Sequence, residues 1–202
     1  MINKIGTKRQ FDYQIISDWV ALDSKVLDLG CGQGLLLEKL NKERNAYTVG
    51  VDTDPAKVGS CIQKSIPVYQ GDIFDLLKEC PDQSFDWVIC SRTAHELVEP
   101  AKVLLEALRV GRHLVIGFVN NAFWLNRLNM LWHGRRIINE VYPDLWYKDR
   151  PTNAVSISDF EQFCQDNAVR INRRFCLDGS WRKPCYFLPK WFAGYVLYEL
   201  SR

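Results

Sequence analysis

The sequence contains no long apolar run, no secretion-signal pattern and no marked excess of charge of one sign. No stretch reaches the roughly 18 apolar residues of a membrane-spanning helix, and the first residues lack the apolar core of a signal peptide. Lysine and arginine total 26 against 24 aspartate and glutamate residues, a net charge of +2. Such a balance creates no large field for nucleic acid or an anionic membrane, so we expect neither as a partner.

Paired metal-ligand cysteines are also missing. The seven cysteines are odd in number and widely spaced, and they include no C-x-x-C pair. Because such pairs are typical of structural zinc and dithiol redox sites, the spacing disfavours both. We expect buried thiols, no bound metal and a reducing, cytoplasmic location.

What the chain does contain is enough apolar material for one core. Its 202 residues, 47% of them hydrophobic, suffice for one α/β domain and are few for two. We therefore expect a single domain over residues 1–202. Within it we expect a leading helix segment over 1–23 and an insertion of a helix and a long loop over 120–155.

Strand-like and helix-like segments alternate along the first 120 residues. This alternation predicts a parallel sheet with helices on both faces. The predicted strands are 25–30, 46–52, 66–70, 84–90 and 113–119, and the predicted helices are 11–22, 35–44, 55–64 and 99–110. Asp54 followed by Pro55 is typical of a helix N-cap with proline in the first turn.

The second half of the chain is less regular. Ser158 and Glu161 have the spacing of a capping box, and a strand is expected over 169–177. The apolar end, 186–200, predicts two β segments interrupted by Pro189.

Aromatic residues in the expected insertion leave alternatives open. Apolar side chains recur at helical intervals over 124–132, for which core packing is the expected reason and a protein-binding surface the alternative. Trp146 and Tyr147 further along could cover a substrate pocket as a lid or bury the long loop against the sheet.

Three glycines at alternate positions, Gly30, Gly32 and Gly34, stand between a predicted strand and a predicted helix. Glycine permits positive φ and close approach of a ligand to the backbone, so the cluster predicts a binding turn. A dinucleotide turn needs G-x-G-x-x-G, whose third glycine would fall at Leu35. The G-x-G-x-G spacing therefore disfavours NAD.

Carboxylates after successive strands suggest how such a ligand is held. Asp28 would repel a pyrophosphate and suits a ligand that carries an ammonium group. Asp52 ends the second strand, where its side chain can accept hydrogen bonds from both hydroxyls of a ribose. The run Gly71-Asp72-Ile73 could supply a carboxylate and an apolar neighbour for an adenine ring. The alternative is a plain tight turn in which Asp28 is a turn residue and Asp52 caps a helix.

Four segments between residues 26 and 97, "VLDLGCGQG", "GVDTD", "QGDIFD" and "SFDWVICSRTAHEL", resemble the sequential motifs of class I S-adenosylmethionine-dependent methyltransferases. The resemblance implies a three-layer Rossmann-like α/β fold with a mostly parallel seven-stranded sheet, an antiparallel last strand and helices on both faces. It implies S-adenosyl-L-methionine as cofactor, with S-adenosyl-L-homocysteine as product. The cofactor-binding residues it implies are Asp28, Gly30, Cys31, Gly32, Gly34, Asp52, Thr53, Gly71, Asp72, Ile73 and Ser91.

Longer phrases over about residues 24–178 are similar to the MetW family of methionine biosynthesis proteins. They include "LRVGR" at 108–112, a W-x-x-R-L pattern at 124–128 and "YPDLWYKDRPTNAVSISDFEQFC". Residues 119–121 and 92–96 depart from the family's usual phrases. The resemblance implies a role in methionine metabolism and a homoserine O-acyltransferase as a possible partner.

Two residues after the fourth predicted strand are candidates for catalysis. His95 could act as a general base near neutral pH, and Arg92 could orient a carboxylate of a small-molecule acceptor. The alternative is that His95 and Glu96 are solvated residues of a loop.

These observations leave three functions open. The chain could bind S-adenosylmethionine and methylate a small molecule, or it could be a non-catalytic accessory subunit that regulates a homoserine O-acyltransferase. A NAD-binding oxidoreductase is the third, which the missing glycine disfavours.

Overall fold

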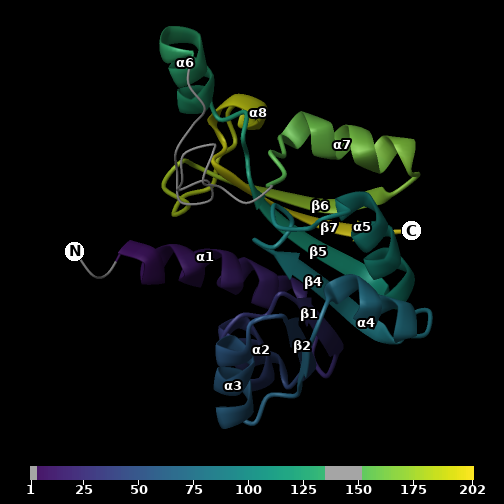
Figure 1. Ribbon diagram of the computed structural model, residues 1–202. Coiled ribbons are helices and arrows are strands. Elements are labelled where there is room, and N and C mark those ends of the chain that lie inside the picture. Colours follow the sequence, from purple (N-terminus) through teal and green to yellow (C-terminus); the bar gives the residue numbers. More distant parts are fainter. Residues whose placement is uncertain (1–3, 135–151) are drawn as a thin grey trace.

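The protein forms one continuous twisted sheet covered by helices (Figure 1). The structure is a computed structural model that describes residues 4–134 and 152–202, with residues 4–10 described as backbone alone. Residues 135–151, which include the predicted lid residues Trp146 and Tyr147, lie outside the described residues.

Seven strands form the sheet in the order β3-β2-β1-β4-β5-β7-β6. Only β7 runs antiparallel to its neighbours, β5 and β6. The mostly parallel seven-stranded sheet with an antiparallel last strand is thus confirmed. The strands are β1 (Lys25–Leu29), β2 (Tyr47–Asp52), β3 (Val68–Gln70), β4 (Phe85–Ser91), β5 (Gly111–Val119), β6 (Arg170–Leu177) and β7 (Tyr195–Ser201).

Helices cover both faces of the sheet, as predicted (Figure 1). Apolar side chains of α1 and α2 pack with one face, and those of α4, α5 and α7 pack with the other. The helices are α1 (Lys4–Trp19), α2 (Leu35–Arg44), α3 (Pro55–Gln63), α4 (Ile73–Glu79), α5 (Pro100–Val110), α6 (Trp124–His133), α7 (Ile157–Asp166) and α8 (Pro189–Phe192).

Local sequence signals account for several helix starts. The side chain of Asp54 accepts a hydrogen bond from the backbone N–H of Ala56, and Pro55 occupies the first turn of α3, as predicted. Helix α2 begins at Leu35, directly after Gly34 in left-handed conformation. Both helices therefore start at the carboxyl ends of their preceding strands.

Two predictions in the second half are wrong. The capping box of α7 joins Ser156 to Asp159, two residues before the predicted pair Ser158 and Glu161. Pro189 does not separate two β segments, because it opens the short helix α8 and one strand, β7, follows. Proline fits a first helical turn, where its missing N–H leaves no partner unsatisfied.

Two further helices differ from expectation. Helix α4 was not predicted, and it begins because the Asp72 side chain accepts hydrogen bonds from the backbone N–H groups of Phe74 and Asp75. Core packing does not explain the apolar stripe over 124–132, because α6 has no buried residue. Five of its apolar side chains, Leu125, Leu128, Met130, Leu131 and Trp132, are exposed, which leaves the protein-binding alternative.

Candidate functional site

The glycine turn lies at the carboxyl edge of the sheet, between β1 and α2. Gly30, Gly32 and Gly34 have φ angles of +78°, +57° and +73°, which other residues adopt with strain. The backbone N–H groups of Gly30 and Cys31 donate to the Val51 carbonyl at 2.8 and 3.0 Å. These bonds hold the turn against the end of β2.

Each glycine of the turn has a different environment. A Cβ at Gly30 would lie 2.5 Å from the Thr93 Oγ1 atom, and one at Gly34 would lie 2.9 Å from the Ile66 Cδ1 atom. A Cβ at Gly32 would meet nothing within 4 Å. The outer two glycines therefore permit close packing, and the middle one borders open space where a ligand can approach the backbone.

Asp52 ties this turn to the next strand. It is 7% exposed, and its Oδ2 accepts a hydrogen bond from the Gly32 N–H at 2.9 Å. Its Oδ1 accepts from the Asp54 N–H at 2.9 Å, and the Lys57 ammonium lies 3.9 Å away. A carboxylate can accept more than two hydrogen bonds, so capacity for a ribose hydroxyl remains.

Asp28 is a buried carboxyl group beside the turn. It is 4% exposed, and among the described residues its side chain makes no hydrogen bond. Burial, followed by the nearby charge of Asp52, raises the pKa of Asp28 to about 7. A cationic group placed at this carboxyl would favour its ionised form.

The remaining predicted cofactor residues surround the same edge. Cys31 is buried, its Sγ lies 4.0 Å from that of Cys61, and burial raises the pKa of its thiol. Thr53 is exposed directly after β2. The Gly71 N–H donates to the Asp52 carbonyl at 3.2 Å, which brings the end of β3 to the turn.

Asp72 and Ile73 follow Gly71 at the start of α4. Oδ1 of Asp72 is the atom that caps α4, whereas among the described residues its Oδ2 accepts no hydrogen bond. Ile73 is partly buried and packs against the main core cluster. Their predicted contact with an adenine ring stays a prediction.

The segment after β4 contains Ser91 and Arg92. The Ser91 hydroxyl lies 3.1 Å from the Tyr195 hydroxyl, which joins the ends of β4 and β7. Arg92 has a φ of +65°, and its Nε donates to Oδ2 of Asp12 in α1 at 2.9 Å. Its guanidinium also lies 5.0 Å from the centre of the Trp181 ring.

The ion pair between Arg92 and Asp12 was not predicted from the sequence. The two residues are 80 positions apart, and a helix and a loop bring them together, so no local pattern could have shown the contact. The Asp12 side chain is 1% exposed and that of Arg92 is 23% exposed. The Nη2 atom of Arg92 is buried and has no hydrogen-bond partner among the described residues.

His95 lies three residues further on, in the same loop. Its side chain is 17% exposed, and its Nε2 lies 3.5 Å from the Glu96 carboxylate. Its backbone carbonyl accepts a hydrogen bond from the Asn153 N–H at 2.9 Å. The loop is therefore fixed at both ends, and the catalytic roles of His95 and Arg92 stay predictions.

Comparison with known proteins identifies the family. The model of the family "Methionine biosynthesis protein MetW" matches residues 10–200. This chain belongs to the MetW family. A bifunctional methionine biosynthesis protein MetXA/MetW of Rhodopirellula baltica is 31% identical over 132 residues, which is 61% of this chain and 21% of that protein.

Methyltransferases are the other similar proteins. A ubiquinone biosynthesis O-methyltransferase of Hahella chejuensis is 32% identical over 103 residues, 48% of this chain and 43% of that protein. The MetW-family chain spans less than half the length of these two relatives. A solved S-adenosylmethionine-dependent methyltransferase of Archaeoglobus fulgidus has a TM-score of 0.68 at 15% identity, over 99% of this chain and 95% of that one. It shows that the chain has the class I methyltransferase fold.

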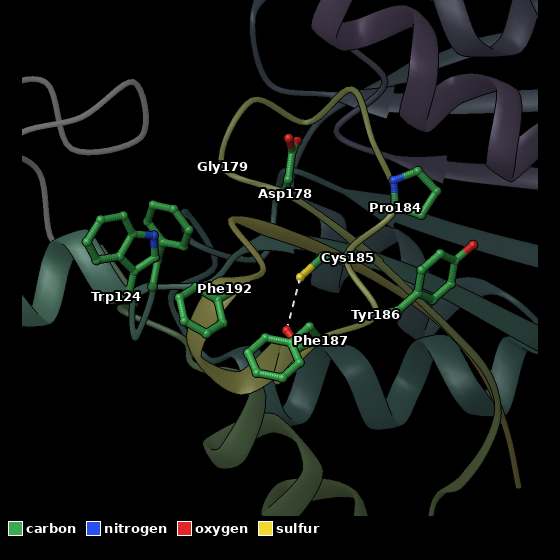
Figure 2. Close-up of a pocket in the computed structure, with 9 residues that line it drawn as sticks. Trp124, Asp178, Gly179, Pro184, Cys185, Tyr186, Phe187 and Phe192 are labelled. Carbon is green, nitrogen blue, oxygen red and sulfur yellow. Dashed lines mark hydrogen bonds between the residues drawn. The ribbon is translucent and has the colours of Figure 1, made fainter.

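A pocket that sequence reasoning missed lies beyond the end of β6 in this MetW-family chain (Figure 2). Its volume is about 400 Å³. The lining is largely aromatic and comes from the loop before α6, from α6 itself and from the segment 178–192. The lining residues are Phe123, Trp124, Asp178, Gly179, Pro184, Cys185, Tyr186, Phe187 and Phe192.

Membrane-spanning helices and clusters of metal-ligating side chains are both absent from the described part of the chain. None of the helices in residues 4–134 and 152–202 is long and apolar enough to cross a membrane. In the same residues no group of three or more histidine, cysteine, aspartate or glutamate side chains is arranged to hold a metal ion.

Proposed function

We propose that this MetW-family chain binds S-adenosylmethionine at the glycine turn and acts in methionine metabolism in the cytoplasm. The Asp28 carboxyl carries the proposal, because it is buried without a hydrogen bond among the described residues at the edge where the turn borders open space. The positively charged ammonium group of a methionine moiety pairs with this carboxyl group and favours its ionised form. Asp52 and Thr53 then face the ribose, and Gly71, Asp72 and Ile73 the adenine.

We also propose a site for a small-molecule acceptor beside Ser91. When bound, the donor would supply the methyl group of its sulfonium to an acceptor nucleophile in line with the S–CH3 bond, and the sulfur would leave as the thioether of S-adenosylhomocysteine. Arg92, whose side chain is 23% exposed, orients an acceptor carboxylate. His95 removes a proton from the acceptor nucleophile, with Glu96 beside its Nε2 atom.

Calorimetric titration tests the cofactor proposal directly. We expect binding of S-adenosylmethionine and S-adenosylhomocysteine, and none of NAD. Asp52→Ala should weaken S-adenosylmethionine binding by roughly 1.5–3 kcal/mol, because hydrogen bonds to a charged group are lost. The matched control is Asp166→Ala, which changes an exposed residue at the end of α7. This variant should bind S-adenosylmethionine as tightly as the wild type does. Binding of NAD alone would refute the proposal.

A second candidate function is a non-catalytic accessory subunit of a homoserine O-acyltransferase. Two observations favour it: Arg92 is already engaged with the buried Asp12, and a similar protein is named as bifunctional for MetXA and MetW. Co-purification from the native host, with acyltransferase activity measured before and after deletion of this chain, tests it. The role fails if the two proteins do not associate and the activity does not change.

A further inference from the structure

One end of the molecule exposes an unusual number of apolar side chains. Figure 1 shows α6 projecting beyond the sheet with α8 beside its base, and neither helix has a buried residue. More than half of the exposed large apolar side chains among the described residues lie on α6 or in 186–192. We define the α6–α8 surface by the most exposed of them, Leu131 (77%), Trp132 (71%), Tyr186 (85%) and Phe187 (72%).

This surface is held in place by contacts between its two segments. The Arg127 guanidinium lies 4.1 Å from the centre of the Trp191 ring, and its Nη2 donates to the Lys190 carbonyl at 3.4 Å. The rings of Trp124 and Phe192 lie 6.3 Å apart. These contacts fix the first turns of α6 against α8, so a partner would meet the two helices together.

The aromatic pocket opens within the same region (Figure 2). Figure 2 shows Phe192 between Trp124 and Phe187, and the rings of Phe187 and Phe192 lie 5.7 Å apart. A concave pocket of about 400 Å³ is large enough for one aromatic or branched aliphatic side chain. Residues that dominate protein interfaces are typically anchors in such pockets.

The charged residues within the two segments of the surface are all basic. Residues 120–134 and 179–192 contain no aspartate or glutamate. Asp178, which precedes the second segment, uses its carboxylate to accept hydrogen bonds from Ser180 and the Arg182 N–H. No carboxylate of the described residues pairs with Arg127 or Lys183. A complementary face would therefore carry acidic side chains.

We propose that the α6–α8 surface docks a partner protein, which places an apolar side chain in the pocket and acidic residues against Arg127 and Lys183. The proposal rests on the accessory function above, so the partner is the homoserine O-acyltransferase. A lipid surface fits less well, because membrane-surface helices are rich in lysine and arginine, whereas α6 has a single arginine.

Binding of the purified acyltransferase to purified variants of the full chain tests the proposal. The double variant Leu131→Glu/Trp132→Glu should weaken binding at least about 30-fold, since it places charge where apolar contact is needed. Phe187→Ala should weaken it about tenfold without adding charge. The matched control, Leu22→Glu/Tyr47→Glu, changes residues that are 64% and 69% exposed before β1 and at the start of β2, away from α6, and should bind like wild type.

The outcomes separate this inference from the proposed function. Equal binding of the wild type, the surface variant and the control variant overturns the docking surface and leaves the accessory role intact. Failure of the wild type to bind the acyltransferase overturns both. In that event two further measurements identify the occupant. Flotation with anionic phospholipid vesicles that the surface variant loses would assign the surface to lipid. Self-association in sedimentation velocity that the surface variant loses would assign it to a second copy of the chain.

Discussion

The glycine-turn edge and the α6–α8 surface differ in what they bury: the turn buries hydrogen-bonded polar groups, and the surface leaves large apolar side chains exposed. At the turn, backbone N–H groups that follow β1 and β3 donate to the backbone carbonyls and the Asp52 carboxylate at the end of β2, and Asp28 and Asp52 are buried. At the α6–α8 surface, helices without a buried residue present large apolar side chains outward. The first region suits a small polar ligand that needs a preorganised site, and the second suits a macromolecule.

The comparison predicts that substitutions near the turn affect folding far more than those on α6. Arg92→Ala should lower the free energy of unfolding by about 3–5 kcal/mol, because it leaves the buried Asp12 carboxyl without its cation. Burial already raises the pKa of Asp12 despite the Arg92 charge. Urea unfolding measures the effect.

The control for this prediction is Arg112→Ala. The Arg112 side chain is 62% exposed, and its carboxylate partner Asp86 is 3.9 Å away, so the loss should stay below about 0.5 kcal/mol. Equal losses of unfolding free energy in the Arg92 and Arg112 variants would show that the buried ion pair between Arg92 and Asp12 does not stabilise this edge.

The next largest effect is expected within the turn itself. Gly30→Ala should cost about 2–3 kcal/mol, because it combines a positive φ with a Cβ that lies 2.5 Å from Thr93 Oγ1. Gly32→Ala carries the positive φ without a clash and should cost about 1 kcal/mol. Thermal and urea unfolding of both variants measure the difference in the free energy of unfolding. Equal losses would mean that the Thr93 side chain moves to make room for the methyl group.

Much of this edge was predictable because its signals are local. Asp54 and Pro55 start α3 where the sequence indicates, and Gly34 directly precedes α2. Where two residue pairs fit the same local pattern, the prediction from sequence was wrong. Both Ser156 with Asp159 and Ser158 with Glu161 have capping-box spacing, and only the first pair forms it.

Other features depend on contacts that sequence does not display. The pairing of Asp12 with Arg92 joins residues 80 positions apart. Asp72 carries both a predicted adenine contact and an unexpected helix cap, since an aspartate after a strand fits either role. The exposure of α6 was likewise hidden, because an apolar stripe looks the same whether it packs inward or faces a partner.

A third prediction uses pH to separate the two regions. The folded-state pKa of Asp28 is raised to about 7 from 3.8, so the folded protein retains a proton that the unfolded chain releases. Its stabilising contribution is complete below the unfolded pKa and is lost as pH rises through about 7. In the ligand-free protein this should remove about 1.4 kcal/mol of stability per pH unit between about pH 4 and about pH 7.

Asp28→Asn should make that slope shallower, because asparagine does not titrate. Urea unfolding at several pH values, for the wild type and the variant, measures the difference in slope. Parallel curves would show that Asp28 is not held protonated in the folded state. S-adenosylmethionine should bind more tightly as pH rises through 7, since its ammonium pairs with the ionised carboxyl.

The smallest effect on folding is expected on α6. Leu131→Glu/Trp132→Glu replaces side chains that are 77% and 71% exposed, so the free energy of unfolding should change by less than about 0.5 kcal/mol. Urea unfolding of this variant beside Leu22→Glu/Tyr47→Glu measures it. A loss above about 1.5 kcal/mol would mean that these side chains stabilise the chain's own fold. The contrast with the turn would then disappear, because both regions would stabilise the fold. Weaker partner binding by the variant could also be explained by unfolding alone.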